Sequence, residues 1–210
     1  MRGDDRIVKA KTDNEPRLKK HYRAAVVPGM IQKFGFKNPF QVPVLNKIIL
    51  NMGVNDAKED IKSMDQASAE LSAIAGQKPQ VRRAKKSISN FKLRAGMPIG
   101  LRVTLRGARM YEFLDRFVNA AIPRIRDFRG LDPRAFDGRG NYNLGLNEQH
   151  IFPEVDMEKS TKLRGLNVTL VTNARDDAKA RELLTLFGFP FKASDKEETT
   201  KKPKAQPASA

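Results

Sequence analysis

Apolar and polar residues alternate in several parts of the chain, and each alternating segment predicts a β-strand. The clearest examples are 44–52, 99–106 and 166–172, and shorter strands are expected near 80–87 and 142–146. Successive side chains of a strand point to opposite faces of a sheet. Each long strand therefore has one apolar face for a core and one polar face that is free for another purpose.

Between the strands, apolar residues recur at helical spacing and predict four helices. A kink is expected at Pro28, because proline cannot donate the backbone hydrogen bond of a helix interior. Asn55 or Asp56 is predicted to cap the second helix and Asp176 the last one. The expected helices cover residues 16–34, 57–75, 110–122 and 177–187.

This order of helices and strands predicts an α+β fold in one domain, residues 16–191. We expect an antiparallel or mixed sheet with helices packed on one face and a basic, RNA-binding opposite face. Residues 1–15 are charged and predict a flexible basic arm. Residues 192–210 lack periodicity and predict a disordered tail.

The overall charge points to an acidic partner. Forty Lys and Arg against 24 Asp and Glu give a formal net charge of +16. There is no cysteine, which excludes disulfides and thiolate metal sites. No apolar run approaches the roughly 20 residues of a membrane-spanning helix, and the basic segments do not form an amphipathic helix. Nucleic acid is therefore the favoured partner, and no membrane is expected.

The charge is concentrated in residues 71–111, which hold ten basic residues and no acidic one. A charge run is often only a solvated surface. Ten cations without a counter-charge repel one another, however, so phosphate contacts are the favoured interpretation. Phe91 and Asn90 lie among these cations and could stack on bases or bond to them. The basic residues are Lys78, Arg82, Arg83, Lys85, Lys86, Lys92, Arg94, Arg102, Arg106 and Arg109.

Other candidate chemistry is weak. The glycines of 137–145 match neither the dinucleotide-binding nor the P-loop pattern and precede a strand, so a loop is expected there. His21 and His150 have no nucleophile context, and the latter is expected to be a packing residue. Scattered loop carboxylates are usually solvated or paired with Arg, which argues against a metal site. We expect no enzyme activity and no cofactor. The carboxylates concerned are Glu148, Glu154, Asp156 and Glu158.

Several long segments resemble the bacterial form of ribosomal protein number five of the large subunit, a family that binds 5S ribosomal RNA. They read VPVLNKIILNMGV, AIAGQKPQVRRAKKSISNFKLRAGMPIGLRVTLRGARMYEF, PRIRDFRGL, FDGRGNYNLG and EQHIFPE. The similarity covers roughly residues 17–191. One departure is Asn90, where the family often has glycine.

The resemblance implies a protein that attaches 5S RNA in the central protuberance. The positions that match the family's 5S RNA contacts are Asn51, Gln77, Phe91 and Thr104. The polar faces of the strands add Lys47, Arg102 and Arg106 as expected contacts. Further implied partners are large-subunit ribosomal RNA and other 5S-associated ribosomal proteins. The family's loop at 83–97 reaches the peptidyl-site transfer RNA, which here involves Arg83, Lys85, Lys86, Lys92 and Arg94.

The same resemblance implies a bridge to a head protein of the small subunit, through Arg139, Asn141, Asn143 and Glu148. From the residues alone, 5S RNA could not be told from another structured RNA. A free RNA-binding regulator therefore remains the alternative, whereas an enzyme would need a titratable cluster that the sequence does not offer.

Overall fold

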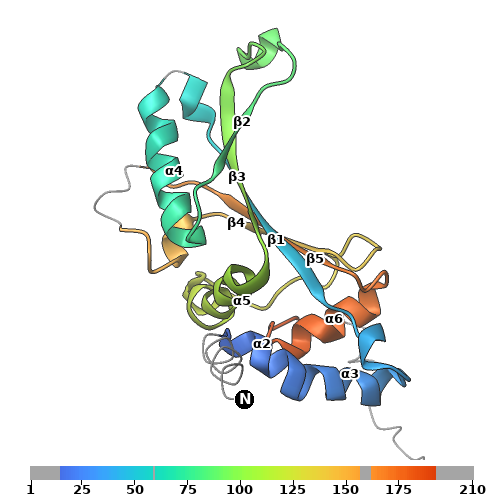
Figure 1. Ribbon diagram of the computed structural model, residues 1–210. Helices are drawn as coiled ribbons and strands as arrows, with labels where there is room; N and C mark the ends of the chain where they lie inside the picture. The colour runs from blue at the N-terminus through green and yellow to red at the C-terminus, as the bar shows by residue number, and fades with distance from the viewer. Residues whose placement is uncertain (1–14, 59, 157–161, 193–210) are drawn as a thin grey trace, which may run out of the picture.

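Five strands form one antiparallel sheet in the computed structural model, which describes residues 15–58, 60–156 and 162–192. Their order across the sheet is β2-β3-β1-β5-β4, so the first strand lies at the centre (Figure 1). The predicted α+β class is confirmed, and the sheet is antiparallel rather than mixed. Most of the predicted arm and tail lies outside the described residues. The strands are β1 (Leu45–Gly53), β2 (Gln80–Arg83), β3 (Pro98–Leu105), β4 (Tyr142–Leu146) and β5 (Leu166–Thr172).

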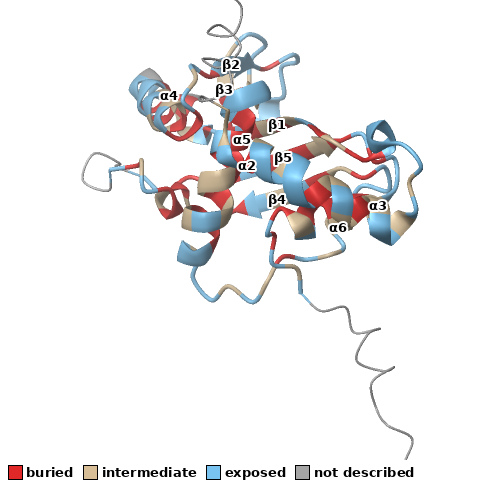
Figure 2. Ribbon diagram, turned by 60° about the horizontal axis from the view of Figure 1, so that its bottom comes forward, coloured by how far each residue is buried: buried red, intermediate tan, exposed pale blue. Residues whose placement is uncertain are grey.

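The helices cover one side of this sheet, as the alternation predicted. Ile48, Leu50 and Met52 of β1 are fully buried on that side, and their register partners on β3 are Leu105, Val103 and Leu101. Buried segments gather where the sheet meets the helices (Figure 2). Each buried Leu or Ile contributes roughly 1.5–3 kcal/mol through burial. The helices are α2 (Arg17–His21), α3 (Val27–Phe34), α4 (Ile61–Ala75), α5 (Gly107–Arg116) and α6 (Asp177–Leu186).

A π turn precedes each of two helix prolines, and the helix continues after Pro28 but ends at Arg124, one residue after Pro123. Before Pro28, the N–H of Val27 donates to the carbonyl of Tyr22, which makes a π turn over Tyr22–Val26. Before Pro123, Ile122 makes the same bond to Phe117. A proline ring clashes with the carbonyl four residues earlier, and a wider turn relieves that clash. The kink expected at Pro28 is this π turn.

Two sequence expectations were wrong in detail. The cap of α4 is Asp60, whose carboxylate accepts from the N–H of Lys62 at 2.9 Å. Asn55 and Asp56 belong instead to a separate 3-10 turn, Asn55–Lys58. The strand expected near 80–87 ends at Arg83, just after a shift in its register with β3 between Arg82 and Arg83.

The remaining boundaries agree closely with the pattern. β4 and β5 have the predicted ends, and Asp176 caps α6 by accepting from the N–H of Ala178. Gly35 and Gly76 end their helices in the left-handed conformation. None of the helices in the described ranges has both the length and the apolar character needed to cross a membrane.

Candidate RNA interface

The side of the sheet away from the helices, here called the open face, carries a row of polar side chains on β2, β3, β1 and β5 that ends at a glycine on β4. Asn51 of β1 lies opposite Arg102 of β3 and Asn167 of β5. Gln80 of β2 continues the row beyond Arg102, and Gly145 of β4 continues it beyond Asn167. The structure therefore brings Asn51 and Arg102, both predicted RNA contacts, directly together.

A second row of the open face contains Thr104, which lies beside Ile49 of β1. Lys47 lies farther along the same strand and Arg106 follows directly after β3. Asn51 and Arg106 are exposed, while Lys47, Arg102 and Thr104 are half-buried. Amides, a hydroxyl and guanidinium groups on one side of the β1–β3 pair can bond to both phosphates and base edges.

Sequence reasoning missed the other half of this face. Asn167 and Thr169 extend the two rows, and the Thr169 hydroxyl donates to Asn143 Oδ1 at 2.8 Å. The alternation of 166–172 already placed both on the polar side, so the signal was present. These residues are neutral. The cations of the open face therefore lie on its β1–β3–β2 side.

One glycine of the open face is required by the strands themselves. A Cβ atom at Gly100 would lie 2.8 Å from the backbone oxygen of Met52 on the neighbouring strand. Real Cβ atoms do not approach a carbonyl that closely, and both atoms belong to the backbone ladder. Gly100 is therefore explained by strand packing and gives no evidence of an RNA contact.

Beyond the sheet, β2 and β3 continue into a projecting hairpin whose tip we define as residues 84–97 (Figure 1). Backbone bonds between Ala84 and both Met97 and Gly96 continue the pairing at its base. An isolated bridge joins Ile88 to Leu93 farther out. The tip is thus ordered by its own backbone rather than by packing on the body.

The cations of the hairpin tip face solvent. Lys85, Lys86, Lys92 and Arg94 are exposed, and none of them forms an ion pair within the described part of the chain. Arg83, just before the tip, is different, because its guanidinium donates to the carbonyl of Gly96 at 2.9 Å. The tip therefore presents uncompensated positive charge, which favours phosphate binding.

The other two predicted 5S contacts lie apart from Asn51 and Thr104. Phe91 is 63% exposed on a 3-10 turn of the hairpin tip, which excludes the alternative of a core phenylalanine. Gln77 is half-buried just after α4, near the base of the hairpin. Asn90 does not have a positive φ, so this backbone does not need the glycine that the family often has there. The left-handed residue of the turn is Lys92, with φ 50°.

The four predicted bridge residues do not form one cluster. Arg139 and Asn141 lie in the loop before β4, Asn143 lies on the open face, and Glu148 follows β4. Asn141 is also occupied internally: its amide donates to Asp137 Oδ2 at 2.7 Å. Burial raises the pKa of Asp137, but hydrogen bonds from Asn141 and from backbone N–H groups outweigh burial, and the pKa is lowered overall.

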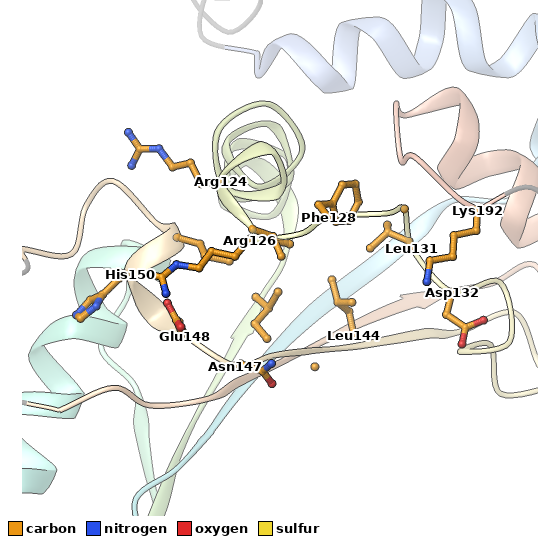
Figure 3. Close-up of a pocket in the computed structure, with 15 residues that line it drawn as sticks. Arg124, Arg126, Phe128, Leu131, Asp132, Leu144, Asn147, Glu148, His150 and Lys192 are labelled. Atoms are coloured by element: carbon orange, nitrogen blue, oxygen red, sulfur yellow. The ribbon is translucent and has the colours of Figure 1, made fainter.

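Glu148 lines a cavity of about 350 Å³ beside the free edge of β4. Figure 3 shows Arg126 and Glu148 toward one end of this cavity and Lys192 and Asp132 toward the other. Leu144 and other apolar side chains lie between them. Its apolar middle and charged ends suit a protein segment better than a phosphate backbone.

The remaining polar candidates have structural roles. Glu154 forms an ion pair with Arg116, and His150 is half-buried with its Nε2 atom shielded from solvent. Gln149 is fully buried, and its amide donates to the carbonyl of Lys162 at 2.7 Å. Within the described ranges, no three His, Asp or Glu lie together as metal ligands. Glu158, one of the carboxylates considered, lies outside these ranges.

Comparison with known proteins matches both halves of this architecture. Residues 38–94 match the family model described as ribosomal protein L5, and residues 98–191 match the model for the C-terminus of the same ribosomal family. The chain belongs to the ribosomal protein L5 family. The first match contains β1, α4 and nearly all of the hairpin tip, and the second contains β3 and the rest of the sheet.

Curated relatives are similar over almost their whole length. Large ribosomal subunit protein uL5 of Syntrophus aciditrophicus is 55% identical over 177 residues, which is 84% of this chain and 99% of the relative. The proteins of the same name from Polaromonas naphthalenivorans and Acidovorax sp. are 57% and 58% identical over 176 residues, 84% of this chain and 98% of each relative.

Family membership makes the chain a large-subunit ribosomal protein that takes part in translation. The family consists of ribosomal structural proteins and is not an enzyme family. In bacteria the ribosome is a cytoplasmic particle. Ribosomal RNA is accordingly a partner of the chain.

Proposed function

We propose that the chain binds 5S ribosomal RNA through the open face and attaches this RNA in the central protuberance of the large subunit. The observation that carries the proposal is the row formed by Arg102, Asn51 and Asn167 across the centre of the sheet. The row joins one cation to two amides on an otherwise uncovered surface. Such a surface binds phosphate through charge and distinguishes one RNA from another through its neutral groups.

The hairpin tip is proposed to reach a second RNA, the peptidyl-site transfer RNA. A β-strand advances about 3.3 Å per residue, so the four strand residues from Arg102 back to Pro98 span roughly 13 Å, and the tip lies beyond them. An RNA that touched both Asn51 and Phe91 would have to follow the whole hairpin. Lys85, Lys86 and Arg94 form no ion pair with other described residues and lie beyond the open face, which supports a separate contact.

For the bridge to a small-subunit head protein, the two ends of β4 offer different surfaces. Arg139 is exposed at one end, and at the other the cavity beside Glu148 offers an apolar middle between charged ends. Large-subunit RNA and other 5S-associated proteins are the remaining proposed partners. Asn143 fits the open face better than the bridge, because it bonds to Thr169 there.

A salt titration of the isolated protein with 5S RNA tests the main proposal. If about five phosphates are neutralised, log affinity should fall with log salt at a slope of about −3.5 to −4.5. Unrelated RNA hairpins of equal length provide the control. A flat slope, or equal binding to the control hairpins, would contradict the proposal, and equal binding would favour a free RNA-binding regulator.

A further inference from the structure

Phe40 is the most exposed large hydrophobic residue in the described ranges. Its exposed fraction is 94%, against 63% for Phe91. It lies on a 3-10 turn, Pro39–Gln41, between α3 and β1, at the end of the molecule opposite the hairpin tip (Figure 1). An aromatic ring this exposed to water would give favourable free energy if a partner covered it.

The turn holds this ring outward rather than leaving it to fold back. The backbone N–H of Phe40 donates to Asn38 Oδ1 at 2.9 Å, which fixes the start of the turn. On the other side Val42 is 1% exposed, so it anchors the turn in the core. The carbonyl of Pro43 accepts from the hydroxyl of Tyr22 at 3.0 Å. A ring on a turn fixed at both ends loses little entropy when it binds.

The surroundings of the ring are polar and positively charged. There is no acidic residue from 16 to 55, and Lys37, Asn38 and Gln41 are all exposed around the turn. The neighbouring start of α6 does carry acids, but both are occupied. Asp176 caps that helix, and Asp177 accepts from two backbone N–H groups of the loop before β4.

We propose that Phe40 stacks on an unpaired base of large-subunit ribosomal RNA. A protein pocket would require several apolar groups beside the ring, whereas the exposed neighbours here are a lysine and two amides, with Pro39 as the one apolar residue among them. An aromatic ring among such groups suits a splayed base and its phosphates. The hairpin tip has the same combination in Asn90, Phe91 and Lys92.

This inference rests on the proposed function and adds a contact to it. The open face, the hairpin tip and the ends of β4 are proposed for 5S RNA, transfer RNA and the head protein. Of the remaining proposed partners, the large RNA best suits a ring among positively charged and amide side chains. Stacking tolerates different bases, and the nucleotide is therefore identified only as unpaired. A ring that stacks on the large RNA while the open face binds 5S RNA joins the two RNAs through one rigid body.

The chain contains no tryptophan, so Phe40→Trp places a single fluorescent reporter in the turn. The variant protein is first bound to 5S RNA, and this complex, checked by gel shift, is then titrated with large-subunit RNA. We expect no quenching in the first step and strong quenching in the second. Leu163→Trp, at a position that is 62% exposed, is the control for quenching by proximity alone.

Affinity of the 5S complex for large-subunit RNA gives an independent measurement. Phe40→Ala and Phe40→Leu should each weaken it roughly five- to a hundredfold, because neither offers a ring. Phe40→Tyr should retain it. The exposed ring makes few contacts within the chain, so these variants should all unfold at the parent's urea midpoint.

Several results would overturn the inference. They are quenching of the reporter by 5S RNA alone, equal quenching of the Leu163→Trp control, or full affinity for the large RNA in Phe40→Leu, which would show that the binding does not need an aromatic ring. Blue-shifted emission before any RNA is added would place another part of the chain over the ring. Normal 5S binding with no quenching by the large RNA would contradict this inference alone. If the parent protein did not bind 5S RNA, that result would contradict the proposed function instead.

Discussion

The hairpin tip and the loop before β4 are both rich in polar residues, yet the structure uses them in opposite ways. In the loop, polar groups are used internally: the N–H groups of Gly138 and Gly140 donate to the carboxylate of Asp177 on α6 at 3.1 and 2.8 Å. In the hairpin tip, Lys85 and Lys86 remain exposed without an ion pair among the described residues. A polar segment is therefore available to a partner only when the fold leaves its groups unused.

This contrast predicts that removing the hydrogen bonds that hold the loop before β4 lowers the stability of the protein and leaves RNA binding intact. The largest effect is expected for Asp177→Ala, which leaves two backbone donors without their acceptor. Hydrogen bonds to a charged group contribute about 1.5–3 kcal/mol each, so the free energy of unfolding should fall by about 3 kcal/mol. Urea unfolding measures it. Glu112→Ala removes an exposed carboxylate from α5 and is the control, and a similar loss in both variants would break the comparison.

Alkaline pH should destabilise the same region through Tyr142. Burial raises the pKa of this tyrosine from 10.0 to about 12, with a smaller contribution from Asp132. The folded state thus holds the phenolic proton more tightly than the unfolded state. The contribution of protonated Tyr142 to the free energy of unfolding is complete below pH 10 and is lost between pH 10 and about 12. Two pKa units correspond to about 2–3 kcal/mol.

Tyr142→Phe isolates this contribution, because phenylalanine has no proton to lose. Urea unfolding at pH 8 and at pH 11.5 should show a smaller loss of stability in the variant than in the parent. Some loss should remain, since burial also raises the pKa of Tyr22 to about 12. Parallel losses in the two proteins would show that the Tyr142 hydroxyl is not sheltered.

The open face should behave in the opposite way to the loop. Asn51→Ala or Thr104→Ala should reduce the preference for 5S RNA over a competitor hairpin by ~1–2 kcal/mol, because a partner group on the RNA loses its bond. Stability should change little. Competition binding measures the preference, with Asn46→Ala, at an exposed position on β1, as the control. If the single change Arg82→Ala lowers the preference equally, then positioning and recognition are not separated on this surface.

The smallest effect on stability is expected at the hairpin tip. Replacing Lys85 and Lys86 by Ala and Arg94 by Ser should change the free energy of unfolding by less than about 0.5 kcal/mol, since exposed side chains contribute little. Subunit assembly should continue while protection of the peptidyl-site transfer RNA in chemical footprinting is lost. A matched variant loses the same charge elsewhere, with Lys20 and Lys62 changed to Ala and Arg134 to Ser. Unchanged transfer-RNA protection, together with lost 5S binding, would assign the tip to 5S RNA.

The sequence predicted features that depend on neighbouring residues and missed features that depend on contacts between residues distant in the chain. Alternation located β4 and β5 and put Asn51 and Thr104 on the uncovered side, because strand faces depend only on local period. The strand order β2-β3-β1-β5-β4 depends on pairing between distant segments, and no local pattern encodes it.

The misses in the site have the same origin. Charge patterning located the hairpin cations, but it could not show that Arg83 bonds to Gly96 or that Asn141 is held by Asp137. Asn167 and Thr169 were missed because charge patterning does not mark neutral residues, and their place beside the rows of Asn51 and Thr104 depends on strand pairing. The cap at Asp60 was missed because Asn55 and Asp56 satisfy the same sequence rule five and four residues earlier.

The central position of β1 also affects how the protein is made. β1 is synthesised first among the strands, but one of its two neighbours, β5, leaves the ribosome last. At about 5–20 residues per second, the nascent chain carries β1 with an unpaired edge for several seconds after β3 is complete. An exposed strand edge invites pairing with other chains. A protein destined for the ribosome therefore passes through an aggregation-prone interval during its own translation, and the delay before β5 emerges sets the length of that interval.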